Sequence, residues 1–150
     1  MDLILWRHAE AEDGGPDLAR KLTPLGHAQA AGAAAWMRAH LPADFEVLAS
    51  PAVRAQQTAQ ALGMPVKTVA TLAPGAPVTA ILGAAGWPDR PMAAVLVGHQ
   101  PDLGRAAAFL VAAKEAEWHI DKGALWWIAG DKRPFIRAVI SPGVLSPDVL

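Results

Sequence analysis

Three short, mainly apolar runs, each followed by a polar junction and a helical pattern, constrain the fold of this chain most. The runs cover residues 3–6, 45–49 and 93–97. Short apolar runs that stop at polar residues are typical of strands buried on both faces of a parallel sheet. Because strands that alternate with helices form α/β layers, the pattern predicts a mostly parallel sheet with helices on both faces.

A capping residue followed by proline marks the start of two predicted helices. Thr23-Pro24 and Ser50-Pro51 each combine an N-cap side chain with proline at the first helical position. The first helix should end near residue 40, with Gly32 packed closely against the sheet. The residues predicted to share its buried face are Leu25, Ala28, Gly32, Ala35, Trp36 and Ala39. The second helix should carry the apolar positions Ala52, Ala55, Ala59 and Leu62.

The remaining elements are shorter. A strand is predicted at 66–69, a helix at 78–85, and a helix after residue 101 with an apolar face of Leu103, Ala107, Leu110 and Val111. Residues 124–129 and 135–140 flank a Gly- and Pro-containing loop, which predicts two antiparallel strands. The tail with Pro142 and Pro147 should be an irregular surface segment. We therefore expect one domain over residues 1–150, a three-layer αβα sandwich with an antiparallel C-terminal strand.

Composition excludes several classes of function. The chain has no cysteine, so disulfides, thiolate metal sites and cysteine nucleophiles are excluded. Its net charge of −1 comes from scattered residues and gives no footprint for nucleic acid or an anionic membrane. The N-terminus lacks the basic residues of a signal peptide, and no apolar run approaches the roughly 18 residues of a membrane span. We expect a soluble, cytoplasmic protein. Adjacent Trp126 and Trp127 should face opposite ways and pack, rather than stack on bases.

Basic residues gather where the predicted parallel strands end. Arg7 and His8 end the first strand, Arg54 lies in the first helical turn after the second, and His99 and Gln100 follow the later strand. Ligands of open parallel sheets bind beyond the carboxyl ends of the strands. Helix N-termini at the same junctions favour a phosphate-sized anion. Two arginines and two histidines at one sheet edge predict a phosphate pocket.

Four segments resemble motifs of the histidine phosphatase, or phosphoglycerate mutase-like, superfamily. Residues 5–11 resemble its Arg-His-Gly signature, with Ala9 in the glycine position, and residues 20–26 resemble the start of its first helix. Residues 50–59 resemble its second arginine motif and 97–103 its second histidine motif. Residues 72–74 and 122–125 are weaker matches. Four motifs in the expected order are specific, and the short Val-Gly-His-Gln-Pro form is similar to SixA-type phosphohistidine phosphatases.

The resemblance implies that His8 is a nucleophile that becomes phosphorylated. It implies phosphate contacts from Arg7, Arg54, His99 and the backbone N–H of Gln100, and no cofactor or metal ion. The physical chemistry agrees, because phosphoryl transfer depends on positioning and on stabilising spread negative charge. Guanidinium groups donate paired hydrogen bonds and remain charged. Positive neighbours should also keep the attacking imidazole neutral.

The proton donor is less clear than the phosphate ligands. Relatives take an acid from an insertion, but here the only acidic residue in the interval 70–92 is Asp89. Among the acids of the first loop, Glu10, Glu12, Asp13 and Asp17, the spacing of Asp17 to Arg20 resembles SixA, which makes Asp17 the candidate acid. A short interval without the inserted lid and its acid predicts an open pocket and a leaving group that departs easily. Phosphohistidine on a signalling or phosphocarrier protein meets both conditions.

Three other functions stay open at this stage. The chain could hydrolyse a small phosphate monoester, or bind phosphate through Arg7, Arg54 and His99 without turning it over. His8, His99 and the loop acids could instead form a metal site, although their spacing matches no known ligand pattern.

Overall fold

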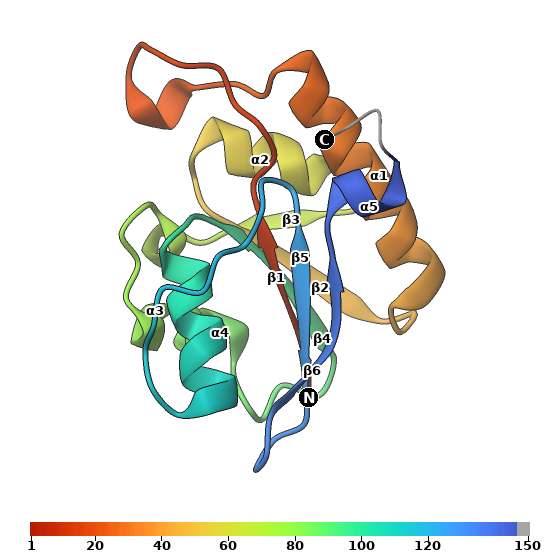
Figure 1. The fold of residues 1–150 in the computed structure, drawn as a ribbon, viewed down its shortest axis with the longest axis vertical. Coiled ribbons are helices and arrows are strands. Elements are labelled where there is room, and N and C mark those ends of the chain that lie inside the picture. The colour runs from red at the N-terminus through yellow and green to blue at the C-terminus, as the bar shows by residue number, and fades with distance from the viewer. Residues whose placement is uncertain (147–150) are drawn as a thin grey trace.

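The computed structural model describes residues 1–146 and contains one six-stranded sheet (Figure 1). The strand order is β3-β2-β4-β1-β5-β6. β1, β2, β3 and β4 are parallel, while β5 runs antiparallel to both of its neighbours, β1 and β6. This confirms the mostly parallel sheet with an antiparallel C-terminal strand. The strands are β1 (Asp2–Arg7), β2 (Phe45–Ala49), β3 (Val66–Thr68), β4 (Ala93–Gly98), β5 (Leu125–Ala129) and β6 (Phe135–Ile140).

Helices cover both faces of the sheet, which gives the expected three layers. α1 (Pro24–His40) and α2 (Val53–Gln60) pack on one face, and α3 (Val78–Ala85) and α4 (Asp102–Ala112) pack on the other (Figure 1). Single 3-10 turns occur at Asp17–Ala19 (η1) and Ala70–Leu72 (η2). In β1, Ile4 and Trp6 point to the α1 side, while Leu3 and Leu5 point to the α4 side. A strand buried on both faces accounts for the continuous apolar run.

The strand register brings the sequence-predicted junctions to one edge of the sheet. Arg7 lies opposite Gly98, and Ala49 lies opposite Val97. The backbone N–H of His8 donates to the Gly98 carbonyl at 3.0 Å, and Ser50 N–H donates to Val97 at 3.0 Å. The residues that follow β1, β2 and β4 therefore emerge side by side.

The buried face of α1 is not the one predicted. The residues that are buried are Gly26, Gln29, Ala30, Ala33, Ala34 and Met37, whereas Ala28, Ala35 and Ala39 are exposed. Nothing approaches Gly32, but a Cβ at Gly26 would overlap the carbonyl oxygen of Glu10. Gly26 is thus the glycine that close packing requires. An alanine-rich helix offers small residues all round, so its apolar periodicity does not identify a face.

α2 begins later than the Ser-Pro signal predicts. Ala52, not Ser50, is its N-cap residue, and the hydroxyl of Ser50 accepts the Ala52 N–H at 3.1 Å in the turn before the helix. A serine side chain can bind the backbone two residues ahead in such a turn as readily as it caps a helix. Ser50 is therefore free to make another contact with its hydroxyl.

The C-terminal region contains one element that sequence reasoning missed. α5 (Pro142–Leu145) is a short helix that packs against α1, with Pro142 buried, so this part of the tail is not irregular. Proline at the first helical position explains how the segment can be helical. Pro147 lies outside the described residues.

The two adjacent tryptophans of β5 face opposite sides, as predicted. Trp127 meets Trp36 of α1 edge-on at 6.4 Å between ring centroids, and Trp126 contacts Trp118 at 5.9 Å on the other side. Both rings therefore pack within the protein. Over residues 1–146, no helix has the length and apolar character to cross a bilayer.

Candidate active site

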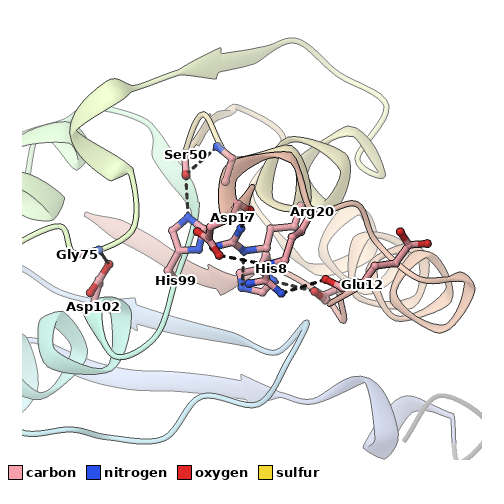
Figure 2. A network of polar contacts seen from close by, with 11 residues as sticks. His8, Glu12, Asp17, Arg20, Ser50, Gly75, His99 and Asp102 are labelled. Carbon is pink, nitrogen blue, oxygen red and sulfur yellow. Dashed lines mark hydrogen bonds and ion pairs between the residues drawn. The ribbon is translucent and has the colours of Figure 1, made fainter. Parts of the chain in front are cut away.

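His8 and His99 meet at the carboxyl ends of β1 and β4 (Figure 2). Their ring centroids are 5.2 Å apart, and both side chains are buried. Arg54 reaches the same place from the first turn of α2, and its Nε lies 3.3 Å from Nε2 of His8. The structure thus brings three of the predicted residues into one cluster.

The hydrogen bonds of His8, from Nδ1 to the Ala9 carbonyl and from Arg54 Nε–H to Nε2, determine which of its ring nitrogens carries the proton. Nδ1 lies 2.8 Å from the carbonyl oxygen of Ala9, which can only accept, so Nδ1 carries the proton and Nε2 keeps its lone pair. Burial, reinforced by the charges of Arg54, Arg7 and Arg20, lowers the pKa of His8 to about 4. The ring is therefore neutral near pH 7, and Nε2 is available as a nucleophile.

Arg54 lies between His8 and Asp17. Its NH1 donates to the Asp17 carbonyl at 2.7 Å, and its NH2 donates to the Asp17 carboxylate at 3.2 Å. Arg20 also binds that carboxylate, at 3.1 Å. The hydrogen bond from Arg54 lowers the pKa of Asp17. Asp17 is therefore ionised in this arrangement, and a carboxylate in that form has no proton to donate.

Within residues 1–146, two buried side-chain polar atoms have no hydrogen-bond partner, and both belong to predicted phosphate ligands. They are Nε of Arg7 and Nδ1 of His99. The other contacts of these side chains hold them in place: NH1 of Arg7 donates to the Ile120 carbonyl at 2.8 Å, and Nε2 of His99 is 2.8 Å from the Ser50 hydroxyl. Buried polar groups without partners are costly, so these atoms point to a bound ligand that completes them.

Gln100 and Glu10 make structural contacts, and Asp89 lies away from the site. The side-chain amide of Gln100 donates to the Trp118 carbonyl and accepts the Gly104 N–H, bracing the start of α4; its backbone contact with phosphate stays a prediction. Glu10 accepts the hydroxyl of Thr23 at 2.7 Å. Asp89 precedes Arg90, which pairs with Glu46 near the start of β2, so Asp89 lies at the opposite edge of the sheet.

Sequence reasoning missed two side chains that support the site. Thr58 accepts the Ala9 N–H at 3.0 Å and donates to the Arg54 carbonyl at 2.7 Å, so it links the β1 junction to α2. Asp102 is buried and accepts the N–H groups of Gly75 and Ala76, holding that loop beside α4 (Figure 2). The sequence signal that could have identified them was their spacing. Thr58 is four residues after Arg54, and Asp102 is three residues after His99.

A cleft of about 570 Å³ lies beside Arg7 and is much larger than a phosphate group needs. It lies between the segment 119–122, α5 and the residues Arg7, Glu10 and Gln29. Of His8, His99, Arg7 and Arg54, the cleft is lined by Arg7, so it adjoins the candidate site through this residue. No cluster of three or more His, Cys, Asp or Glu side chains that could hold a metal ion occurs in the part of the chain that the structure describes.

The lowered pKa of His8 predicts an acid-tolerant enzyme. The sequence motifs imply that His8 is a nucleophile, and with the neutral ring as its reactive form kcat/KM should persist as pH falls below 6.5 and drop only near the pKa of about 4. The measurement is a pH profile of kcat/KM, corrected for substrate ionisation, with circular dichroism at each pH to confirm folding. A loss centred near 6.5 would mean that His8 titrates as an exposed histidine does.

The fold and the site define an α/β protein with two histidines and two arginines at the carboxyl ends of its parallel strands and in the helical turn that follows. A family model described as "Histidine phosphatase superfamily (branch 1)" matches residues 3–75. An uncharacterized protein of Mycobacterium tuberculosis is 37% identical over 108 residues, covering 69% of this chain and 68% of the relative. The chain belongs to branch 1 of the histidine phosphatase superfamily and is a phosphatase of that superfamily.

Two solved structures have the same fold. The protein histidine phosphatase SixA complexed with tungstate superposes with a TM-score of 0.84 and 22% identity, over 97% of this chain and 100% of that one. A putative phosphohistidine phosphatase SixA from Nakamurella multipartitia gives 0.80 and 27% identity, over 94% and 95%. The phosphoglycerate mutase-like architecture predicted from the motifs is thereby confirmed.

Proposed function

We propose that this protein removes the phosphoryl group from phosphohistidine on a signalling or phosphocarrier protein, through a phosphorylated His8. The observation that carries the proposal is the pair of unpartnered buried atoms, Arg7 Nε and His99 Nδ1, on the two residues that adjoin His8 in the chain and in the cluster. Arg54 donates its Nε–H to Nε2 of His8 at 3.3 Å, and turning this guanidinium to a phosphoryl oxygen would release the lone pair for attack. A phosphoryl group is the ligand that this combination of a nucleophile and donors suits.

In the first step, Nε2 of His8 forms a bond to phosphorus and the bond from phosphorus to the substrate nitrogen breaks. The electron pair of that bond returns to the substrate imidazole, which takes a proton from solvent and leaves neutral. The ring of phosphorylated His8 becomes cationic, because Nδ1 keeps its proton. The carbonyl of Ala9, 2.8 Å from Nδ1, stabilises this charge.

In the second step, water attacks phosphorus and the bond to Nε2 breaks. Its electron pair returns to the ring of His8, and the product is dihydrogen phosphate or its conjugate base. Arg7, Arg54 and His99 act in both steps, since each transition state spreads negative charge over the same three oxygens. The neutral His8 is then ready for another turnover.

The local acids favour a phosphoramidate over an ordinary ester. An alkoxide needs a proton to leave, but Arg20 as well as Arg54 lowers the pKa of Asp17, so a hydrogen bond that favours the ionised form remains when Arg54 turns to phosphate. Glu10 accepts the hydroxyl of Thr23. An imidazole leaving group can take its proton from solvent. The open cleft beside Arg7 also has room for a phosphorylated side chain that projects from another protein.

The alternative substrate is a small phosphate monoester. The volume of the cleft beside Arg7 is also sufficient for a small metabolite. In that reaction Asp17 would act as the acid once phosphate has displaced it from Arg54.

Comparing substrates tests the proposal directly. We expect kcat/KM for a histidine-phosphorylated phosphotransfer domain to exceed that for phosphoserine, sugar phosphates and nucleotides by about tenfold or more. Excess chelator should leave the rate unchanged if no metal ion takes part. A preference for one of the esters would replace the proposed substrate, and inhibition by chelator would support a metal site.

A further inference from the structure

We propose that Ser50 is a positioning residue that fixes the ring tautomer of His99, so that Nδ1 bears the proton and donates to the phosphoryl group. The inference rests on the proposed function only in taking the phosphoryl group as the ligand of His99. The tautomer of His99 itself follows from hydrogen bonds between residues of the protein.

Ser50 is held rigidly and has no access to solvent. It is 0% exposed. Its N–H donates to the Val97 carbonyl at 3.0 Å, and its own carbonyl accepts Nε2 of Gln56 at 2.8 Å. With both backbone groups bound, the position of Oγ is determined by the junction between β2 and α2. The hydroxyl of Ser50 is therefore out of reach of bulk solvent.

The Ser50 hydroxyl makes two hydrogen bonds. Oγ accepts the Ala52 N–H at 3.1 Å and lies 2.8 Å from Nε2 of His99. A hydroxyl has one proton to donate, and an N–H group cannot accept it. Of the two partners, only Nε2 of His99 can therefore receive that proton. If Nε2 were protonated instead, the hydroxyl proton would be buried without an acceptor, which is costly.

A neutral histidine that accepts at Nε2 must carry its proton on Nδ1. This is the atom of His99 that is buried without a partner. Figure 2 shows the His99 ring with Ser50 on one side and the cluster of His8 and Asp17 on the other. Nδ1 of His99 is thus a hydrogen-bond donor without an acceptor among the described residues, and phosphoryl oxygens are acceptors.

The two histidines consequently present opposite chemistry to the same ligand. His8 is held at Nδ1 by the Ala9 carbonyl and offers a lone pair, whereas His99 is held at Nε2 by Ser50 and offers an N–H. With ring centroids 5.2 Å apart, one ring can attack phosphorus while the other binds an oxygen. The wrong tautomer of His99 would direct a lone pair at an anionic oxygen.

Nitrogen chemical shifts of the histidine rings in the folded protein test the tautomer without any substrate. In the wild type, His99 should be protonated at Nδ1. In Ser50→Ala, part of the population should move to protonation at Nε2. Thr68→Ala is the matched control, because Thr68 also binds Gln56 but does not contact His99. Protonation of His99 at Nε2 in the wild type would overturn the proposal.

Activity measurements then show whether Ser50 acts through His99. Losing an outer partner that orients an active-site ligand typically costs about 10–100-fold, which we expect for kcat/KM of Ser50→Ala, with Thr68→Ala unchanged. In a His99→Ala background, Ser50→Ala should have no further effect. An equal loss in both backgrounds would show that Ser50 acts elsewhere. Failure of the wild type on phosphohistidine would affect the proposed substrate alone, since the tautomer is read independently.

Discussion

Replacing His8 with alanine should abolish turnover, lowering kcat by about 10⁴-fold or more, as loss of a covalent nucleophile does in other enzymes. The structure explains why no neighbour can take over. His99 is the other ring in the cluster, but its Nε2 is bound to Ser50 and its Nδ1 is assigned a proton. Arg54 presents a guanidinium group, which donates hydrogen bonds and has no lone pair to offer. Of the side chains in this cluster, we therefore expect His8 to attack phosphorus, through Nε2.

Trapping the intermediate makes this prediction specific. Brief incubation with substrate labelled in its phosphoryl group should leave acid-labile label on the wild type and none on His8→Ala. His27→Ala removes an exposed histidine of α1 and should label like the wild type. Binding of phosphate without turnover or label in the wild type would instead identify a non-catalytic phosphate-binding module. Label retained in His8→Ala would place the nucleophile on another residue.

The sheet could be predicted from the sequence because each of its strands has a local signal. The run at residues 3–6 is apolar at consecutive positions because β1 is covered on both faces. The face of α1 could not be predicted in the same way. Burial there depends on where Glu10 and Gly26 meet, and that contact joins two elements whose local sequences do not specify their distance.

In the candidate site, too, some features could be predicted from the sequence and others could not. His8 and His99 could be placed together because parallel strands bring their carboxyl ends to one edge, whichever residues lie between them. Their protonation could not be predicted, since it depends on single hydrogen bonds to Ala9 and Ser50. The contact of Asp17 with Arg54 likewise depends on the path of an exposed loop. Contacts that depend on positions within a few ångströms can be determined only from the packed structure.

Replacing Arg54 with alanine should lower kcat by about 10²–10³, the usual cost of losing one preorganised donor to a developing anion. The variant should also reveal the second role of Arg54, because its charge is one cause of the lowered pKa of His8. Without Arg54, the pKa of His8 should rise from about 4 towards 6.5, and the acid limb of kcat/KM should move upward with it. A merely structural residue would not shift that limb.

Two further variants separate the charge of Arg54 from its shape. Arg54→Lys keeps a positive charge but cannot donate two parallel hydrogen bonds, so it should preserve the position of the acid limb better than it preserves kcat. Arg38→Ala removes an exposed arginine that binds only the Ala61 carbonyl, and it should match the wild type in both measurements. If Arg54→Ala kept the wild-type rate, phosphate would have to be held by Arg7 and His99 alone. Their unpartnered atoms would then constitute the whole anion site, and Arg54 would serve to anchor Asp17.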